Sequence, residues 1–157
     1  MQTFLPYPSF EETATVLDKQ RIGKQRVEAY QVLNIITTPD YTGGWHNHPA
    51  VHMWRGYEDA LRLYLNAMLV EWEDRGFQNN MVHYDLSQAT IVFPWWLGDA
   101  RLHDSHKSNL LRKDPTYYSQ FGWQVPANLP YFWPVPSIKA PPKAKSSQAS
   151  SLSVSEF

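Results

Sequence analysis

The chain has 157 residues, of which 43% are hydrophobic and 15% aromatic, and its formal net charge is −1. This length and composition fit one globular domain and argue against wholesale disorder. The chain has no cysteine, which excludes disulfide frameworks, thiolate zinc sites and cysteine nucleophiles. No apolar run approaches the roughly 20 residues that a membrane span needs. We therefore expect a cytoplasmic protein that does not enter a membrane.

Positive charge is concentrated in two segments, although the total charge is close to zero. Residues 19–26 contain four cations and no acid, and residues 101–113 contain four cations and one acid. Residues 58–74 reverse the balance, with five acids and one cation. If the two basic segments share one face, the molecule has a basic side that suits a polyanionic partner such as nucleic acid.

The first half of the chain predicts two helices followed by a loop. Ser9 and Glu12 have the spacing of a capping box, and Asp18 is placed to cap a second helix that runs to about Ile36. The expected buried face of the second helix consists of Ile22, Ala29, Leu33 and Ile36. Its expected polar stripe consists of Arg21, Lys24, Gln25, Glu28 and Gln31. Residues 37–49 have loop composition, with two prolines and two glycines.

The second half predicts one long core helix and two shorter helices. Apolar residues at three- and four-residue spacing indicate a helix from Trp54 to Arg75. Asp99 is expected to cap a helix that ends near Arg112, and Asp114-Pro115 to open a short helical turn. Residues 137–157 are rich in Ser, Lys, Pro and Ala, so we expect a disordered tail there. The prediction is an all-α, single-domain helical bundle over residues 1–136, with long loops.

Glu28 is the acidic residue with the clearest potential for a catalytic role. It follows Lys24 by one helical turn and Arg21 by two. One interpretation is an ordinary surface ion pair at i,i+4 spacing, worth about 0.3 kcal/mol. The other is a carboxylate in a basic groove, positioned for proton transfer beside a bound polyanion. Spacing alone leaves both open.

Two further clusters carry polar chemistry. His46, His48 and His52 form one group of histidines, and His103 and His106 form another. They could ligate zinc, order a loop by hydrogen bonding, or contact phosphate. In the sequence, cationic, amide and aromatic side chains follow the second group of histidines. This combination suits phosphate contacts with base stacking nearby. The alternative is a charged surface helix whose tyrosines pack on the core.

Several ordered motifs resemble the pyrimidine-dimer DNA glycosylases, the phage-type endonuclease V family, and in particular its bacterial branch. Near the N-terminus these are Tyr7-Pro8, Leu17-Asp18 and Val27-Glu28-Ala29. Farther along they are Asn47-His48-Pro49, Glu73-Asp74-Arg75-Gly76-Phe77, Ser105-His106-Lys107-Ser108-Asn109-Leu110-Leu111-Arg112-Lys113 and Asp114-Pro115-Thr116-Tyr117-Tyr118-Ser119-Gln120-Phe121-Gly122. Together the motifs cover most of residues 1–122, in order.

The resemblance implies a small all-helical DNA-repair enzyme that distorts double-stranded DNA. In such enzymes the chain's own α-amine attacks C1′ and forms an imine, and a glutamate then assists β-elimination. An α-amine, with an ordinary pKa of about 8, is partly neutral at pH 7 and is a usable nucleophile. Carried onto this chain, the catalytic groups are the amine of Met1 and the carboxylate of Glu28. We expect a monomer that needs no metal and no organic cofactor.

The resemblance and the basic segments together give the candidate DNA contacts. They are Arg21, Lys24, Arg26, His48, His106, Lys107, Asn109, Arg112, Lys113, Tyr117 and Tyr118.

The chain departs from the phage pattern in three respects. Residue 2 is Gln, whose bulk should keep Met1 in place, whereas the phage protein loses its methionine and exposes threonine. Val27 stands where the phage pattern has an arginine, and the chain is not strongly basic. Two rival functions therefore stay open: a binding module that keeps the fold without the chemistry, and a metal-dependent enzyme that uses the histidines.

Overall fold

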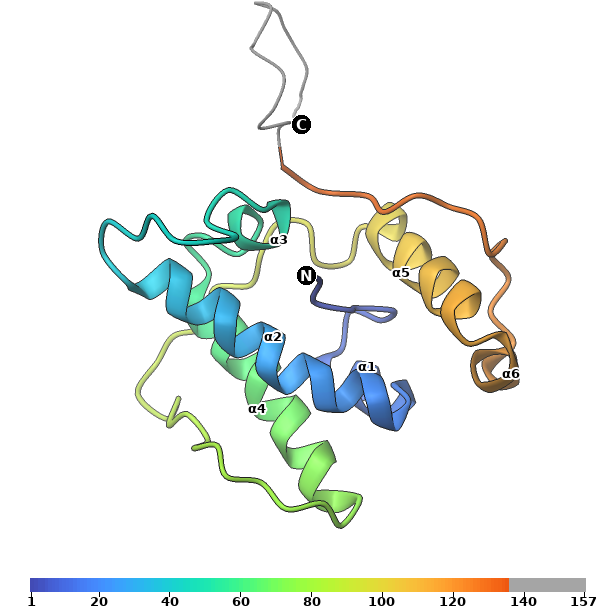
Figure 1. Cartoon of the computed structure of the whole chain (residues 1–157), viewed down its shortest axis with the longest axis horizontal. Coiled ribbons are helices and arrows are strands. Elements are labelled where there is room, and N and C mark those ends of the chain that lie inside the picture. The colour runs from blue at the N-terminus through green and yellow to red at the C-terminus, as the bar shows by residue number, and fades with distance from the viewer. Residues whose placement is uncertain (136–157) are drawn as a thin grey trace, which may run out of the picture.

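A computed structural model describes residues 1–135, which form six α-helices, one 3-10 turn and no β-strand (Figure 1). The elements are α1 (Phe10–Val16), α2 (Lys19–Thr37), α3 (Pro49–His52), α4 (Glu58–Asp74), α5 (Ala100–Lys113), α6 (Pro115–Tyr118) and η1 (Ser119–Phe121). The all-α prediction is confirmed. The tail predicted for residues 137–157 lies outside the described residues. None of the helices between residues 1 and 135 has the length and apolarity to cross a membrane.

Three of the predicted helix starts are made by side-chain caps. The Ser9 hydroxyl accepts a hydrogen bond from Glu12 N at 3.1 Å. The side chains of Asp99 and Asp114 accept hydrogen bonds from backbone N–H groups two and three residues later. Asp18 is also an N-cap residue, of α2, but its carboxylate accepts a hydrogen bond from the Tyr118 hydroxyl instead. The start of α2 is therefore tied to α6.

The helix predicted from Trp54 is wrong at its beginning. The long helix, α4, begins at Glu58, and the residues before it form the short helix α3 and a run of turns. Gly56 has a φ of +87°, a left-handed conformation that a right-handed helix cannot contain. The apolar periodicity continued through this break because Met53 and Trp54 are also buried.

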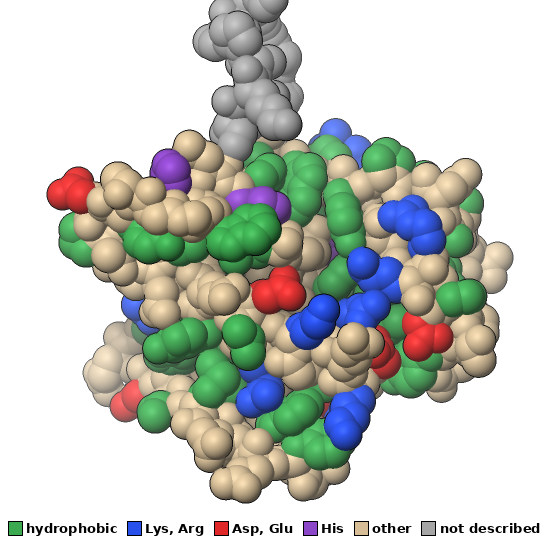
Figure 2. Space-filling model, in the orientation of Figure 1, with side chains coloured by type: hydrophobic (Ala, Val, Ile, Leu, Met, Phe, Trp, Pro, Cys, Tyr) green, Lys and Arg blue, Asp and Glu red, His purple; other side chains and the backbone are tan. Residues whose placement is uncertain are grey.

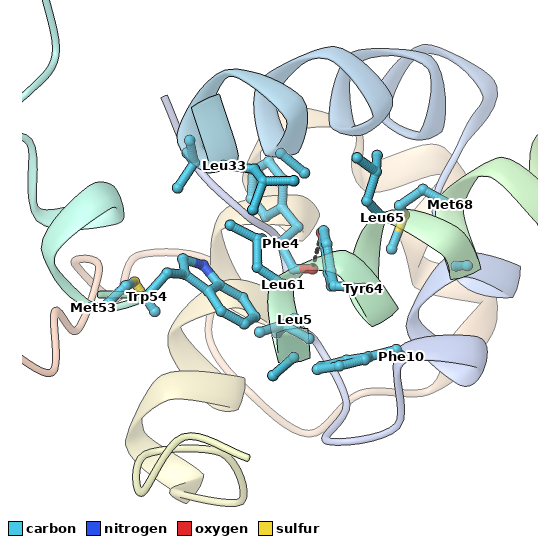
Figure 3. Close-up of a cluster of buried hydrophobic side chains, with 14 of the residues drawn as sticks. Phe4, Leu5, Phe10, Leu33, Met53, Trp54, Leu61, Tyr64, Leu65 and Met68 are labelled. Atoms are coloured by element: carbon cyan, nitrogen blue, oxygen red, sulfur yellow. Dashed lines mark hydrogen bonds between the residues drawn. The ribbon is translucent and has the colours of Figure 1, made fainter. Parts of the chain in front are cut away.

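The core lies where α4 packs against α2 and α1. Figure 3 shows aliphatic side chains from α2 and α4 around the rings of Phe4, Phe10, Trp54 and Tyr64. Tyr64 is fully buried, and its hydroxyl lies 2.8 Å from the Phe4 carbonyl oxygen and 2.7 Å from Gln25 Oε1. Gln25 is therefore a core residue of α2, and its assignment to the polar stripe is wrong.

Candidate functional site

The N-terminal segment, residues 1–8, crosses the middle of the molecule between α2 and α5 (Figure 1). Residues 2–6 are buried, so the chain terminus is packed into the fold. The segment has no strand partner, yet its buried backbone groups need hydrogen bonds. Side chains supply them: Phe4 N to Gln25 Oε1, Leu5 N to His106 Nδ1, Gln25 Nε2 to the Gln2 carbonyl, and His103 Nδ1 to the Leu5 carbonyl.

This packing brings the N-terminus to Glu28. The backbone N–H of Gln2 donates a hydrogen bond to Glu28 Oε1 at 2.9 Å. Only Cα and the carbonyl carbon of Met1 separate its α-amine from that nitrogen, so the amine lies within about 7 Å of the carboxylate oxygen. Met1 and Glu28 are both half-buried. The two predicted catalytic groups are thus brought together by a contact 26 residues apart in the sequence.

His48 belongs to the same region. It is the N-cap of α3, and its Nδ1 accepts a hydrogen bond from Ala50 N at 3.0 Å, so the neutral ring carries its proton on Nε2. Burial lowers the pKa of His48, the N-terminal ammonium lowers it further, and Glu28 opposes both. The imidazole therefore interacts electrostatically with the N-terminus and with Glu28, and it is neutral at pH 7.

A groove runs beside Glu28 along α2. It has a volume of about 760 Å³ and is lined by Lys19, Gln20, Gly23, Lys24, Val27, Glu28, Gln31 and Trp72. The guanidinium of Arg26 stacks over the Trp72 ring at 4.0 Å and adds a third cation to this part of the surface. The hydrogen bond from the N-terminal segment and the cationic groove favour the second interpretation of Glu28, a carboxylate held in a basic groove.

The two basic segments lie on the same side of the molecule. Tyr131 is half-buried, and burial raises its pKa. The charges of Arg112 on α5 and Arg21 on α2 both lower that pKa, and Glu28 raises it. Figure 2 shows Lys and Arg side chains gathered over α2 and toward α5 on the face that carries the N-terminus. The expected basic face is therefore present.

Three predicted DNA contacts are wrong because their side chains are buried in the fold. His106 is fully buried, and its Nδ1 accepts from Leu5 N at 2.8 Å. Asn109 is 1% exposed and donates to the carbonyls of Ser105 and Leu129. Tyr118 is fully buried and stacks on Trp123 at 5.7 Å between ring centroids. These residues position α5, α6 and the chain that follows them.

The remaining candidates on α5 and α6 reach the surface to different degrees. Lys113 is exposed at the end of α5. Arg112 is also exposed, and it donates hydrogen bonds to Asn109 Oδ1 and to the Ala127 carbonyl at 3.3 Å. Lys107 is half-buried, with its ammonium 5.2 Å from the centre of the Tyr7 ring. Tyr117 is half-buried against Tyr118. Lys113 and Arg112 are thus the exposed cations among these candidates.

The histidines order the chain around the site. His46 Nδ1 lies 2.7 Å from the Gly43 carbonyl oxygen, and His103 bridges the Leu5 carbonyl and the Gly98 N–H. Within residues 1–135, no three His, Asp or Glu side chains come together in a way that could hold a metal ion. The arrangement of the histidines in these residues thus gives no support to the alternative of a metal-dependent enzyme.

Burial of His106 predicts acid sensitivity of the fold. Burial lowers the pKa of His106 to about 3, whereas in the unfolded chain it is about 6.5. The unfolded state therefore binds more protons below pH 6.5, and stability falls as the pH falls through this range. The wild-type free energy of unfolding should decrease by up to about 1.4 kcal/mol per pH unit through this residue alone.

His106→Asn supplies the comparison, because its amide oxygen can replace Nδ1 as the acceptor for Leu5 N. Urea unfolding between pH 7 and 5 measures the slope for each protein. The variant should show the shallower pH dependence, and equal slopes would show that His106 does not control this acid sensitivity.

Sequence reasoning missed four residues of this region. Gln2 and Gln25 hold the N-terminal segment, but their amides resemble ordinary surface residues in a sequence. The rings of Trp45 and Trp133 flank His48 edge-on, at 5.3 and 5.5 Å between ring centroids. For Trp45 the Gly43-Gly44-Trp45 sequence was an available signal, because paired glycines mark a loop and loops run over the surface.

The fold and site define a small helical protein whose N-terminus meets a carboxylate beside a basic groove. A family model for pyrimidine dimer DNA glycosylases matches residues 1–85, so the chain belongs to that family. Membership indicates a DNA glycosylase, and the predicted resemblance to the pyrimidine-dimer DNA glycosylases is confirmed at the level of the family. Searches of curated proteins and of solved structures found no match. The matched residues contain the N-terminal segment, α2, α3 and α4, and therefore Met1, Glu28 and His48.

Proposed function

We propose that this protein is a DNA glycosylase with an associated abasic-site lyase activity on damaged duplex DNA, with pyrimidine dimers as the first lesion to test. The α-amine of Met1 attacks C1′ of the damaged nucleotide and loses a proton, and the bond from C1′ to the base breaks. The base takes up a proton and is freed from its sugar, and in a pyrimidine dimer it stays linked to the neighbouring pyrimidine. The nitrogen and C1′ then form an imine as the C1′–O4′ bond of the sugar ring breaks and O4′ takes up a proton. Loss of a proton from C2′ drives β-elimination, which breaks the bond from C3′ to its phosphate oxygen and nicks the strand.

The observation that carries this proposal is the hydrogen bond from Gln2 N to Glu28 Oε1. It holds the chain terminus against a half-buried carboxylate, next to the cationic groove on α2. A carboxylate in this place stabilises cationic character on the sugar and moves the C2′ proton. The nearby cations suit the phosphates on either side of the lesion.

Borohydride trapping tests the proposal. Purified protein is incubated with a duplex that carries a cyclobutane pyrimidine dimer, and separately with a duplex that carries an abasic site, in the presence of sodium borohydride. An imine-forming enzyme becomes covalently attached to the DNA, and the abasic duplex should trap it even if the lesion is a different one. A protein that binds both duplexes without a covalent product would instead be the non-enzymatic binding module.

The basic groove predicts steep salt dependence of DNA binding. Each neutralised phosphate releases counterions, so log affinity falls linearly with log salt concentration. Lys24 is exposed and lines the groove, and Lys24→Gln should reduce the magnitude of that slope by about 0.9. Arg62→Gln is the control, because Arg62 is paired with Asp59 at 2.7 Å in an acidic part of the surface. Fluorescence anisotropy over a salt series measures both slopes, and a salt-independent affinity would contradict the proposed DNA interface.

A further inference from the structure

Trp45 is an exposed aromatic residue in a constrained loop. Its side chain is 55% exposed, whereas the indoles of Trp54 and Trp96 are fully buried. Its φ is +70°, in the left-handed region that bulky residues rarely adopt. Such conformations persist only when the surrounding structure holds them, and they concentrate at binding and catalytic sites.

The surrounding loop holds Trp45 in this conformation by side-chain hydrogen bonds. The Tyr41 hydroxyl donates to the Gly44 carbonyl at 3.2 Å, and His46 Nδ1 lies 2.7 Å from the Gly43 carbonyl oxygen. The Trp45 carbonyl accepts from His48 N at 2.9 Å, which closes the turn into α3. The backbone that carries the indole is therefore held in place by these hydrogen bonds.

The position of the indole relates it to the candidate active site. Its ring lies edge-on to His48, at 5.3 Å between centroids and an angle of 67°. His48 in turn interacts electrostatically with the N-terminus and with Glu28. On the face shown in Figure 2, hydrophobic and histidine side chains lie next to each other over the loop that precedes α3, close to the Lys and Arg cluster. Trp45 thus stands at the border of the site on the side of α3, and the groove lies along α2.

We propose that Trp45 stacks on a nucleobase of the bound DNA beside the Met1–Glu28 site. The inference rests on the proposed function, because it takes DNA as the ligand. Every nucleobase presents a flat π face, and an aromatic ring held at the surface beside a basic groove gives such a base a stacking partner. The His48 ring, which contacts the indole edge-on, also meets the Trp133 ring edge to face at 5.5 Å between centroids.

The test uses a duplex with a tetrahydrofuran abasic analogue, which binds but cannot form an imine, and with 2-aminopurine opposite or next to the analogue. Stacking on an indole quenches 2-aminopurine fluorescence. Trp45→Ala should weaken binding by about 5- to 100-fold and leave the fluorescence unquenched. Trp45→Phe keeps an aromatic face and should retain most of the affinity and of the quenching. Trp95→Ala, which removes a 60% exposed indole between α4 and α5, is the matched control and should bind as the wild type does.

Trp45→Leu provides a second comparison if the alanine variant unfolds, because leucine keeps apolar bulk without a π face. Weaker binding and lost quenching in Trp45→Leu, with both retained in Trp45→Phe, would support the stacking role. If the wild type binds the duplex and is trapped on abasic DNA but all Trp45 variants behave like the wild type, the stacking role is refuted and the proposed function stands. If the wild type binds no DNA at all, the proposed function fails and the stacking role fails with it.

Discussion

Glu28→Gln should reduce strand nicking by at least about 100-fold, the lower end of what a positioned proton-transfer group contributes. The amide oxygen of glutamine can still accept the hydrogen bond from Gln2 N, so the N-terminal segment should stay in place. What the substitution removes is the negative charge and the ability to take a proton. DNA affinity should remain close to the wild-type value, or rise slightly, because one repulsive charge next to the phosphates is lost.

The measurement pairs a nicking assay on a lesion-containing duplex with an anisotropy titration on the same duplex. Glu12→Gln is the control, since Glu12 is an exposed carboxylate on α1 and the same atoms are changed. Wild-type nicking by Glu28→Gln would remove Glu28 from the mechanism. Loss of both nicking and affinity would point to a role in binding instead.

Gln25→Leu should produce the largest loss of stability among single substitutions around the site. The Gln25 amide accepts from Phe4 N at 3.0 Å and donates to the Gln2 carbonyl at 3.0 Å, and the side chain is 1% exposed. Leucine is similar in size but leaves these two buried backbone groups without partners, at about 1–3 kcal/mol each. We therefore expect the free energy of unfolding to fall by about 2–6 kcal/mol.

Urea unfolding checks this value, with Gln31→Leu as the control because Gln31 is exposed on the same helix. The control should change stability by less than about 0.5 kcal/mol. Borohydride trapping should also decline in Gln25→Leu under conditions where the variant is folded, since the N-terminal segment loses an anchor next to Met1. A variant as stable as the wild type would mean that the N-terminal segment is held mainly by its apolar side chains.

The helices were predictable from the sequence because their signals are local. Ser9, Asp99 and Asp114 cap their helices as capping patterns require, and the apolar spacing along α2 and α4 reflects one buried face of each. The beginning of α4 was not predictable from that spacing, because Trp54 is buried without being helical. The break depends on the backbone of Gly56, and hydrophobic periodicity carries no information about it.

The site itself was only partly predictable. Glu28 was found because its motif resembles the family pattern, and the approach of Met1 to it follows from a contact across 26 residues. His106 was misjudged because a histidine among lysines and arginines reads as a surface residue, whereas here it is the buried acceptor for Leu5 N. A polar residue whose hydrogen-bond partner is a backbone group far away in the sequence leaves no pattern in its own segment. Gln25 was assigned to the polar face of α2 for the same reason.

The position of the trapped sugar on the protein tests the proposed mechanism most directly. After borohydride trapping on an abasic duplex, nuclease and trypsin digestion should release a peptide of residues 1–19 that carries the sugar remnant on the Met1 nitrogen, because Lys19 provides the first tryptic site. Chemical acetylation confined to the N-terminus should abolish the adduct. An adduct on a lysine side chain such as Lys24, or trapping that survives N-terminal acetylation, would contradict the assignment of the Met1 amine as the nucleophile.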